Sequence, residues 1–141
     1  MTHVKTSQEI AIMREGGKKL GNILQELLGM ATPGVALIDI DKRADELIER
    51  AGGTPSFKTV KGYGWATCLC VNDAVVHGIP TGYMLREGDV LTIDIGLIYG
   101  GLHTDTAWTK IISHQPSAIS HQQEKEKFLR ICKEALEKGI E

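Results

Sequence analysis

In two stretches of the first half of the chain, apolar residues recur every three or four positions, the spacing typical of amphipathic helices. The first stretch follows a T-x-x-E capping box at residues 6–9 and continues to Leu28. The second covers residues 37–51 and stops at a pair of glycines. Residues 54–65, rich in Gly, Thr, Ser and aromatic side chains, are expected to form a loop.

The middle of the chain changes to the composition of β-strands. A strand is predicted over residues 66–71, and a shorter one over residues 74–77 after an Asn-Asp turn. Two further β-rich runs fill residues 88–110. A polar link over residues 110–124 then leads to a third helix, whose apolar positions fall within residues 128–136.

The two β-rich runs are joined by Tyr99-Gly100-Gly101-Leu102, and a Gly-Gly pair there favours a two-residue hairpin turn with positive φ angles. If residue 99 pairs with 102, then 96 pairs with 105 and 94 with 107. Asp94 and Asp105 thus become diagonal neighbours on one face, with backbones roughly 7 to 8 Å apart. The opposite face carries apolar residues suited to cover by helices: Leu91, Ile93, Ile95, Leu97 and Tyr99.

Composition narrows the class of protein. The chain has 141 residues, 42% of them hydrophobic, which suits one globular domain and excludes a fibre or a disordered tail. A net charge of −2 gives no sign of nucleic-acid or anionic-membrane binding. Three cysteines make no disulfide framework, and no apolar run approaches the roughly 18 residues of a membrane span. A reduced cytoplasm is the expected location.

Two carboxylates on one sheet face either share a proton or bind a cation that removes their repulsion, unless the face is simply solvated. Metal binding is favoured because polar residues flank the pair: Thr92, Thr104, Thr106, His103 and, upstream, His77. Oxygen ligands with an imidazole suit manganese, iron, cobalt or zinc. Taken alone, His77 could be a structural or surface histidine, and His103 is expected to pack beside the site rather than bind the metal.

Five short motifs stand out along the chain: Val71-Asn72-Asp73, His77-Gly78-Ile79-Pro80, Gly88-Asp89-Val90, Ile93-Asp94-Ile95 and His103-Thr104-Asp105-Thr106. Together they resemble the N-terminal half of the type I methionine aminopeptidases. The likeness runs from about Val4 to the end of the chain and includes the eleven-residue interval between Asp94 and Asp105. The combination is specific, although no single motif would be.

The resemblance implies an α+β fold, namely half of the pita-bread architecture, with an antiparallel sheet covered by helices. Residues 1–141 would be the first half of the catalytic domain, and residues 110–141 would hold the link and the first helix of the second half. In that family the two halves together bind two divalent metal ions, which here would be cobalt, manganese, iron or zinc.

By resemblance, Asp94 and Asp105 are two of five metal ligands, with Asp105 bridging the ions. His77 matches the catalytic histidine that contacts the scissile peptide of the substrate. The family's remaining ligands, a histidine and two glutamates, belong to the second half. The chain alone is therefore expected to be inactive.

The resemblance also places a pocket for the substrate's methionine side chain along the loop that precedes the metal ligands. Phe57, Tyr63 and Cys68 are its expected substrate-binding residues, together with His77. Phe57 and Val60 stand where some family members carry Cys and Tyr. This difference bears on the shape of the pocket rather than on metal binding.

The implied function is metal-dependent hydrolysis that removes the N-terminal methionine of nascent proteins when the second residue is small. The implied partners are peptide or nascent-protein N-termini, with proximity to the ribosome, and the full-length form is expected to be a monomer. Three alternatives stay open: a prolidase-like peptidase, a non-catalytic pita-bread binding protein, and an adaptor or ribosome-associated module that arose from a broken copy.

Overall fold

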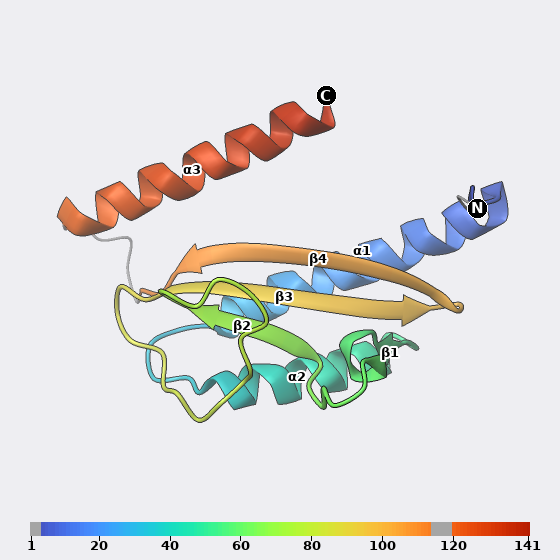
Figure 1. Cartoon of the computed structure of the whole chain (residues 1–141), viewed down its shortest axis with the longest axis horizontal. Coiled ribbons are helices and arrows are strands. Elements are labelled where there is room, and N and C mark those ends of the chain that lie inside the picture. The colour runs from blue at the N-terminus through green and yellow to red at the C-terminus, as the bar shows by residue number, and fades with distance from the viewer. Residues whose placement is uncertain (1–3, 114–119) are drawn as a thin grey trace.

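The structure is a computed structural model that describes residues 4–113 and 120–141 (Figure 1). Its elements in chain order are α1 (Ser7–Met30), α2 (Leu37–Arg50), β1 (Thr54–Pro55), the short 3-10 helix η1 (Phe57–Thr59), β2 (Thr67–Val71), β3 (Val90–Tyr99), β4 (Leu102–Ile111) and α3 (Ser120–Ile140). The helices and the antiparallel sheet form the α+β fold that the sequence predicts. No helix within the described ranges is long and apolar enough to cross a membrane.

The capping box starts α1 as predicted. The Glu9 amide donates to Thr6 Oγ1 at 3.2 Å, and the Thr6 amide donates to the Glu9 carboxylate at 2.7 Å. These two bonds satisfy amide groups that a helix start leaves without partners inside the helix. The apolar stripe of the helix is then buried against the sheet: Leu20, Ile23, Leu24, Leu27 and Leu28.

β3 is the central strand of the four-stranded sheet. β4 pairs with one edge of it along its whole length, from Val90↔Ile111 to Tyr99↔Leu102. β2 and the short β1 share its other edge, β2 beside residues 91–95 and β1 beside residues 97–98. In Figure 1, α1 and α2 lie behind the sheet, while α3 runs past its β4 side.

The predicted hairpin register is confirmed. Gly96 pairs with Asp105 and Asp94 pairs with Ala107, as the Gly-Gly turn requires. Both turn glycines have positive φ, 56° at Gly100 and 78° at Gly101. The predicted apolar face lies in the core, with four of its residues fully buried and packed with the helices: Leu91, Ile93, Ile95 and Leu97. The other face of β3 is left to carry Asp94.

The predicted strand over residues 74–77 is wrong, because this stretch is irregular. Asn72 and His77 both have positive φ, 53° and 55°, and such residues turn the chain out of an extended path. The apolar pair that suggested a strand is exposed, 85% at Val75 and 68% at Val76. Residues 72–89 therefore form a loop over the sheet rather than an added strand.

The predicted polar link over residues 110–124 is too long at both ends. β4 continues to Ile111, and Ile112 is fully buried with its amide donating to the Asp89 carbonyl at 2.7 Å. α3 already begins at Ser120, so the predicted third helix is confirmed but starts earlier. The intervening residues 114–119 lie outside the described part of the chain.

Candidate active site

Asp94 and Asp105 face each other on the side of the sheet away from α1 and α2. Burial raises the pKa of Asp94 above its usual value, and the charge of Asp105 and a hydrogen bond to its carboxyl raise it further. His77 and the amide of Ile95 oppose this shift without cancelling it. The site therefore holds two acids at hydrogen-bonding range, where a second negative charge is unfavourable and a cation would be stabilising.

The donor set fits a hard divalent cation, since carboxylate oxygens are its preferred ligands and adjacent imidazole extends the range to transition metals. Asp94 and Asp105 are the residues that would hold it. Within residues 4–113 and 120–141 the structure gathers no group of three or more His, Cys, Asp or Glu side chains in a metal-binding arrangement. Two carboxylates are fewer protein ligands than such sites usually have, so further ligands would come from elsewhere.

His77 approaches this face from the loop over residues 72–89. The loop is fastened to β2 next to His77: the Leu69 amide donates to the Gly78 carbonyl at 2.8 Å, and the Gly78 amide donates to Cys70 Sγ at 3.3 Å. A Cβ on Gly78 would lie 2.2 Å from the Leu69 oxygen, so only glycine fits. The close approach holds His77 near enough to Asp94 for its charge to act against the rise in the pKa of Asp94.

The other end of the loop is held by Asp89. This residue belongs to the Gly88-Asp89-Val90 motif, but the sequence predicted no role for it. The Asp89 carboxylate accepts hydrogen bonds from the Asn72 side chain, the Tyr83 hydroxyl and the Arg86 amide, each at 2.9 Å. Burial alone would raise the pKa of Asp89, but these donors outweigh it and the pKa is lowered. Asp89 is thus a stable anion that ties the start of the loop to its end.

Tyr63 and Cys68 form one wall beside the acids. The Tyr63 hydroxyl donates to the Thr67 carbonyl at 2.8 Å and lies 3.2 Å from Cys68 Sγ, and Cys68 is the strand partner of Asp94. Burial is the first cause that raises the pKa of both Tyr63 and Cys68. The wall is therefore an uncharged phenol and thiol next to the acidic pair.

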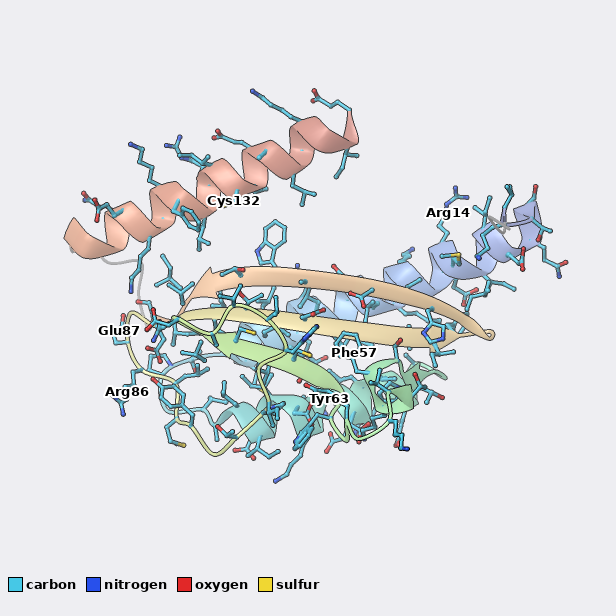
Figure 2. All side chains as sticks on the ribbon, in the orientation of Figure 1. Arg14, Phe57, Tyr63, Arg86, Glu87 and Cys132 are labelled. Atoms are coloured by element: carbon cyan, nitrogen blue, oxygen red, sulfur yellow. The ribbon has the colours of Figure 1, made fainter. Side chains whose placement is uncertain are left out.

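Phe57 lies on the same face, against a strand position that carries no side chain. A Cβ on Gly96 would lie 2.7 Å from Ser56 Cβ and 3.0 Å from the Phe57 ring. Because Gly96 is the strand partner of Asp105, the ring packs directly beside the acidic pair. Figure 2 labels Phe57 and Tyr63, which lie toward the β1 end of the sheet. The structure thus brings the six candidate residues to one face.

Two further side chains contact the segments that carry the pocket residues, and neither of them was assigned a binding role from the sequence. His103 is exposed, and its Nδ1 lies 2.7 Å from Ser56 Oγ, so it packs beside the pocket segment. Asp41 on α2 is buried, and it accepts hydrogen bonds from the backbone just before Cys68. Its position within the apolar stripe of α2 was the available signal, because an acid there must find donors in the core.

The chain is similar to two bacterial enzymes over nearly its whole length. It is 40% identical to the methionine aminopeptidase of Clostridium perfringens over 141 residues, which is 100% of this chain and 54% of that protein. It is 36% identical to methionine aminopeptidase 1 of Bacillus subtilis over 137 residues, 97% of this chain and 53% of that protein. The chain spans about half the length of the curated relatives it matches.

Solved structures give the same picture of the fold. The methionine aminopeptidase of Thermotoga maritima matches with a TM-score of 0.87 and 33% identity, over 98% of this chain and 53% of that one. The prolidase of Pyrococcus furiosus matches with a TM-score of 0.67 and 21% identity, over 76% of this chain and 32% of that one, which supports the fold alone. These likenesses confirm the α+β, pita-bread type of fold.

Residues 11–141 match the family described as metallopeptidase family M24. A match over most of the chain agrees with the opposed acids, the histidine loop and the neutral pocket wall found on one face of the sheet. The chain belongs to metallopeptidase family M24.

Proposed function

We propose that residues 1–141 are the first half of a methionyl aminopeptidase, which removes the N-terminal methionine of peptides whose second residue is small. One observation carries the proposal: the acid pair Asp94 and Asp105 lies beside both the His77 loop and the Tyr63–Cys68 wall. Relatives named methionine aminopeptidase support the choice among M24 activities. A prolidase-like activity rests on likeness of fold only.

The proposed cofactor is a pair of divalent metal ions, each manganese, iron, cobalt or zinc. Asp94 and Asp105 would be ligands. When bound, such ions make a water molecule nucleophilic at neutral pH and polarise the carbonyl that it attacks. The other ligands, a histidine and two glutamates by resemblance, would be supplied from outside residues 1–141, with residues 110–141 forming the link and first helix of that second half.

The residues of this chain have three roles in the proposal. His77 donates a hydrogen bond toward the scissile peptide, where negative charge develops on the carbonyl oxygen. Phe57, Tyr63 and Cys68 surround the substrate's first side chain with uncharged, largely apolar groups that suit a thioether. A tight site around these groups is expected to reject a large second residue.

The proposed partners are peptide and nascent-protein N-termini, in the cytoplasm and close to the ribosome, and the full-length form is proposed to be a monomer. Residues 1–141 alone are proposed to be inactive. The two acids are too few to hold a metal pair tightly, and the second-half glutamate that the family uses to move protons is not among the residues brought to this face. An active 141-residue chain would therefore contradict the assignment of the halves.

The test uses the full protein that contains residues 1–141, loaded with manganese or cobalt. Methionine should be released from a Met-Ala-Ser peptide much faster than from a Met-Trp-Ser peptide, and proline-containing dipeptides should not be cleaved. Asp105→Asn should reduce metal affinity at least tenfold, since even mutation of a residue that only orients a metal ligand typically costs about 10- to 100-fold. Asp39→Asn, on the exposed side of α2, is the matched control. Full metal content in Asp105→Asn, or equal rates on the two peptides, would contradict the proposal.

A further inference from the structure

Asp41 is a buried acid whose role lies outside the acidic pair. It is 6% exposed, and it projects from α2 toward the start of β2. A single carboxylate oxygen, Oδ1, accepts three hydrogen bonds: from the Ala66 amide at 3.0 Å, the Thr67 amide at 2.9 Å and the Thr67 hydroxyl at 2.7 Å. A buried acid with several backbone donors holds those donors in fixed positions, since each would be costly to leave unpaired.

The segment held by Asp41 is the one that carries the pocket wall. Thr67 is fully buried, its carbonyl accepts the Tyr63 hydroxyl, and the next residue is Cys68. Cys68 is in turn the strand partner of Asp94. A chain of direct contacts therefore runs from Asp41 through Thr67 to both wall residues and ends beside the acidic pair.

A second acid on α2 contacts the other end of the same segment. Asp45, one helical turn after Asp41, lies 2.5 Å from the Lys58 ammonium, next to Phe57. Both side chains of this ion pair are about one-third exposed, so its contribution is small. α2 thus contacts the pocket segment at both ends, and Asp41 is the buried and stronger of the two attachments.

We propose that Asp41 is a positioning residue for the segment over residues 57–68, and that it sets where Tyr63 and Cys68 stand relative to Asp94. This inference rests on the proposed function, because it makes Asp41 a determinant of how the substrate's first side chain is bound. Asp41 does not touch the substrate. Its effect should appear in substrate affinity and in the order of the segment, not in the hydrolytic step.

Three substitutions separate the parts of this attachment. Asp41→Asn keeps the shape of the side chain but removes the charge that strengthens all three hydrogen bonds. Thr67→Val removes only the hydroxyl donor, and Thr67→Ser restores it without the methyl group. Asp39→Asn, which changes an exposed acid on the same helix that pairs with Lys42 at 3.7 Å, is the control for loss of charge from α2.

The first measurement is amide hydrogen exchange in the full protein, compared between the peptides that cover residues 62–68 and residues 90–99. Asp41→Asn should speed exchange in residues 62–68 about tenfold, which corresponds to replacing charge-assisted hydrogen bonds with neutral ones. Residues 90–99, which form β3, should change less than about twofold, because a local opening leaves the central strand intact. Thr67→Val should follow Asp41→Asn in part, and Thr67→Ser should resemble the unmodified protein.

The second measurement is the cleavage of methionyl peptides. Asp41→Asn should raise KM about tenfold and leave kcat within about threefold, as expected when binding that is equal in the ground state and the transition state is lost. Unchanged exchange in residues 62–68, equal acceleration in residues 90–99, or an unchanged KM despite faster local exchange would each overturn the inference. If the unmodified protein does not cleave methionyl peptides, the proposed function fails, and the exchange experiment still decides whether Asp41 positions the segment.

Discussion

Replacing Gly78 with alanine tests whether the contact of the loop with β2 is what places His77. A Cβ at this position would lie 2.2 Å from the Leu69 carbonyl oxygen and 2.8 Å from its carbon. An ordinary carbon–oxygen contact is about 3.3 Å, so the loop must move by about 1 Å. The Leu69 carbonyl cannot move away instead, because it belongs to the backbone of β2, where Leu69 is paired with Ile93 inside the sheet.

The expected loss of activity follows from that displacement. A misplacement of about 1 Å at a catalytic group can lower a rate about a hundredfold, and we expect this for kcat on a methionyl peptide. The movement would also weaken the hydrogen bond from the Leu69 amide to the Gly78 carbonyl, at a cost of about 0.5–1.5 kcal/mol in the free energy of unfolding. Gly78→Ala should therefore be folded but nearly as inactive as His77→Ala.

A neighbouring glycine supplies the matched control. Gly82 lies in the same loop, and a Cβ there would have no neighbour within 4 Å. Neither glycine has a positive φ, so alanine is compatible with the backbone at both positions. The assay compares kcat and urea unfolding for Gly78→Ala, Gly82→Ala and His77→Ala in the full protein. Activity of Gly78→Ala within about threefold of Gly82→Ala would refute the argument that this contact positions His77.

Further predictions concern stability and association. Gly96→Ala should crowd the Phe57 ring and destabilise the fold by about 1–3 kcal/mol. Gly17→Ala has open space around it in α1 and should stabilise the fold by about 0.5–1 kcal/mol. Thermal unfolding that ranks the two variants in the opposite order would contradict this account of the packing. Lys110→Met should lower the free energy of unfolding, measured in urea, by about 1–3 kcal/mol, because the ammonium donates to two carbonyls at the end of α1. Lys61→Met, at an exposed position, should have almost no effect, and equal effects of the two substitutions would contradict the prediction. Residues 1–141 alone should self-associate through the exposed apolar side chains of α3, and a monomer at all concentrations in sedimentation velocity would be the contrary result.

The hairpin could be predicted from the sequence because its geometry is local. A two-residue Gly-Gly turn fixes the pairing, and a strand period of two then decides which side chains share a face. Asp94 and Asp105 were placed on one side by these rules alone, and the structure has the same register. The start of α1 could be predicted for the same reason, since the bonds of the capping box join residues only three positions apart.

The loop over residues 72–89 could not be predicted in this way, because its path is set by contacts between distant residues. Asp89 holds Asn72, 17 positions earlier, and Gly78 is fastened to Leu69 in the middle of β2. The apolar Val75 and Val76 suggested a strand, but they pair with no strand in the described part of the chain and both are exposed. The role of Asp41 is hidden for the same reason, since its donors lie 25 and 26 positions further on.

Burial acts on the pKa of Asp41, Asp89 and Asp94, and these three aspartates can be told apart by what surrounds them. Asp89 has donors from three residues, and its pKa is lowered despite burial. Burial raises the pKa of Asp41, but three donors converge on one of its oxygens, so the group is held in place by the fold itself. Asp94 differs, because its pKa is raised by burial and then by another carboxyl, that of Asp105. An acid whose nearest strong partner is a second acid adds nothing to the stability of the fold, and that imbalance marks this pair, rather than the buried Asp41 and Asp89, as the place for a cation.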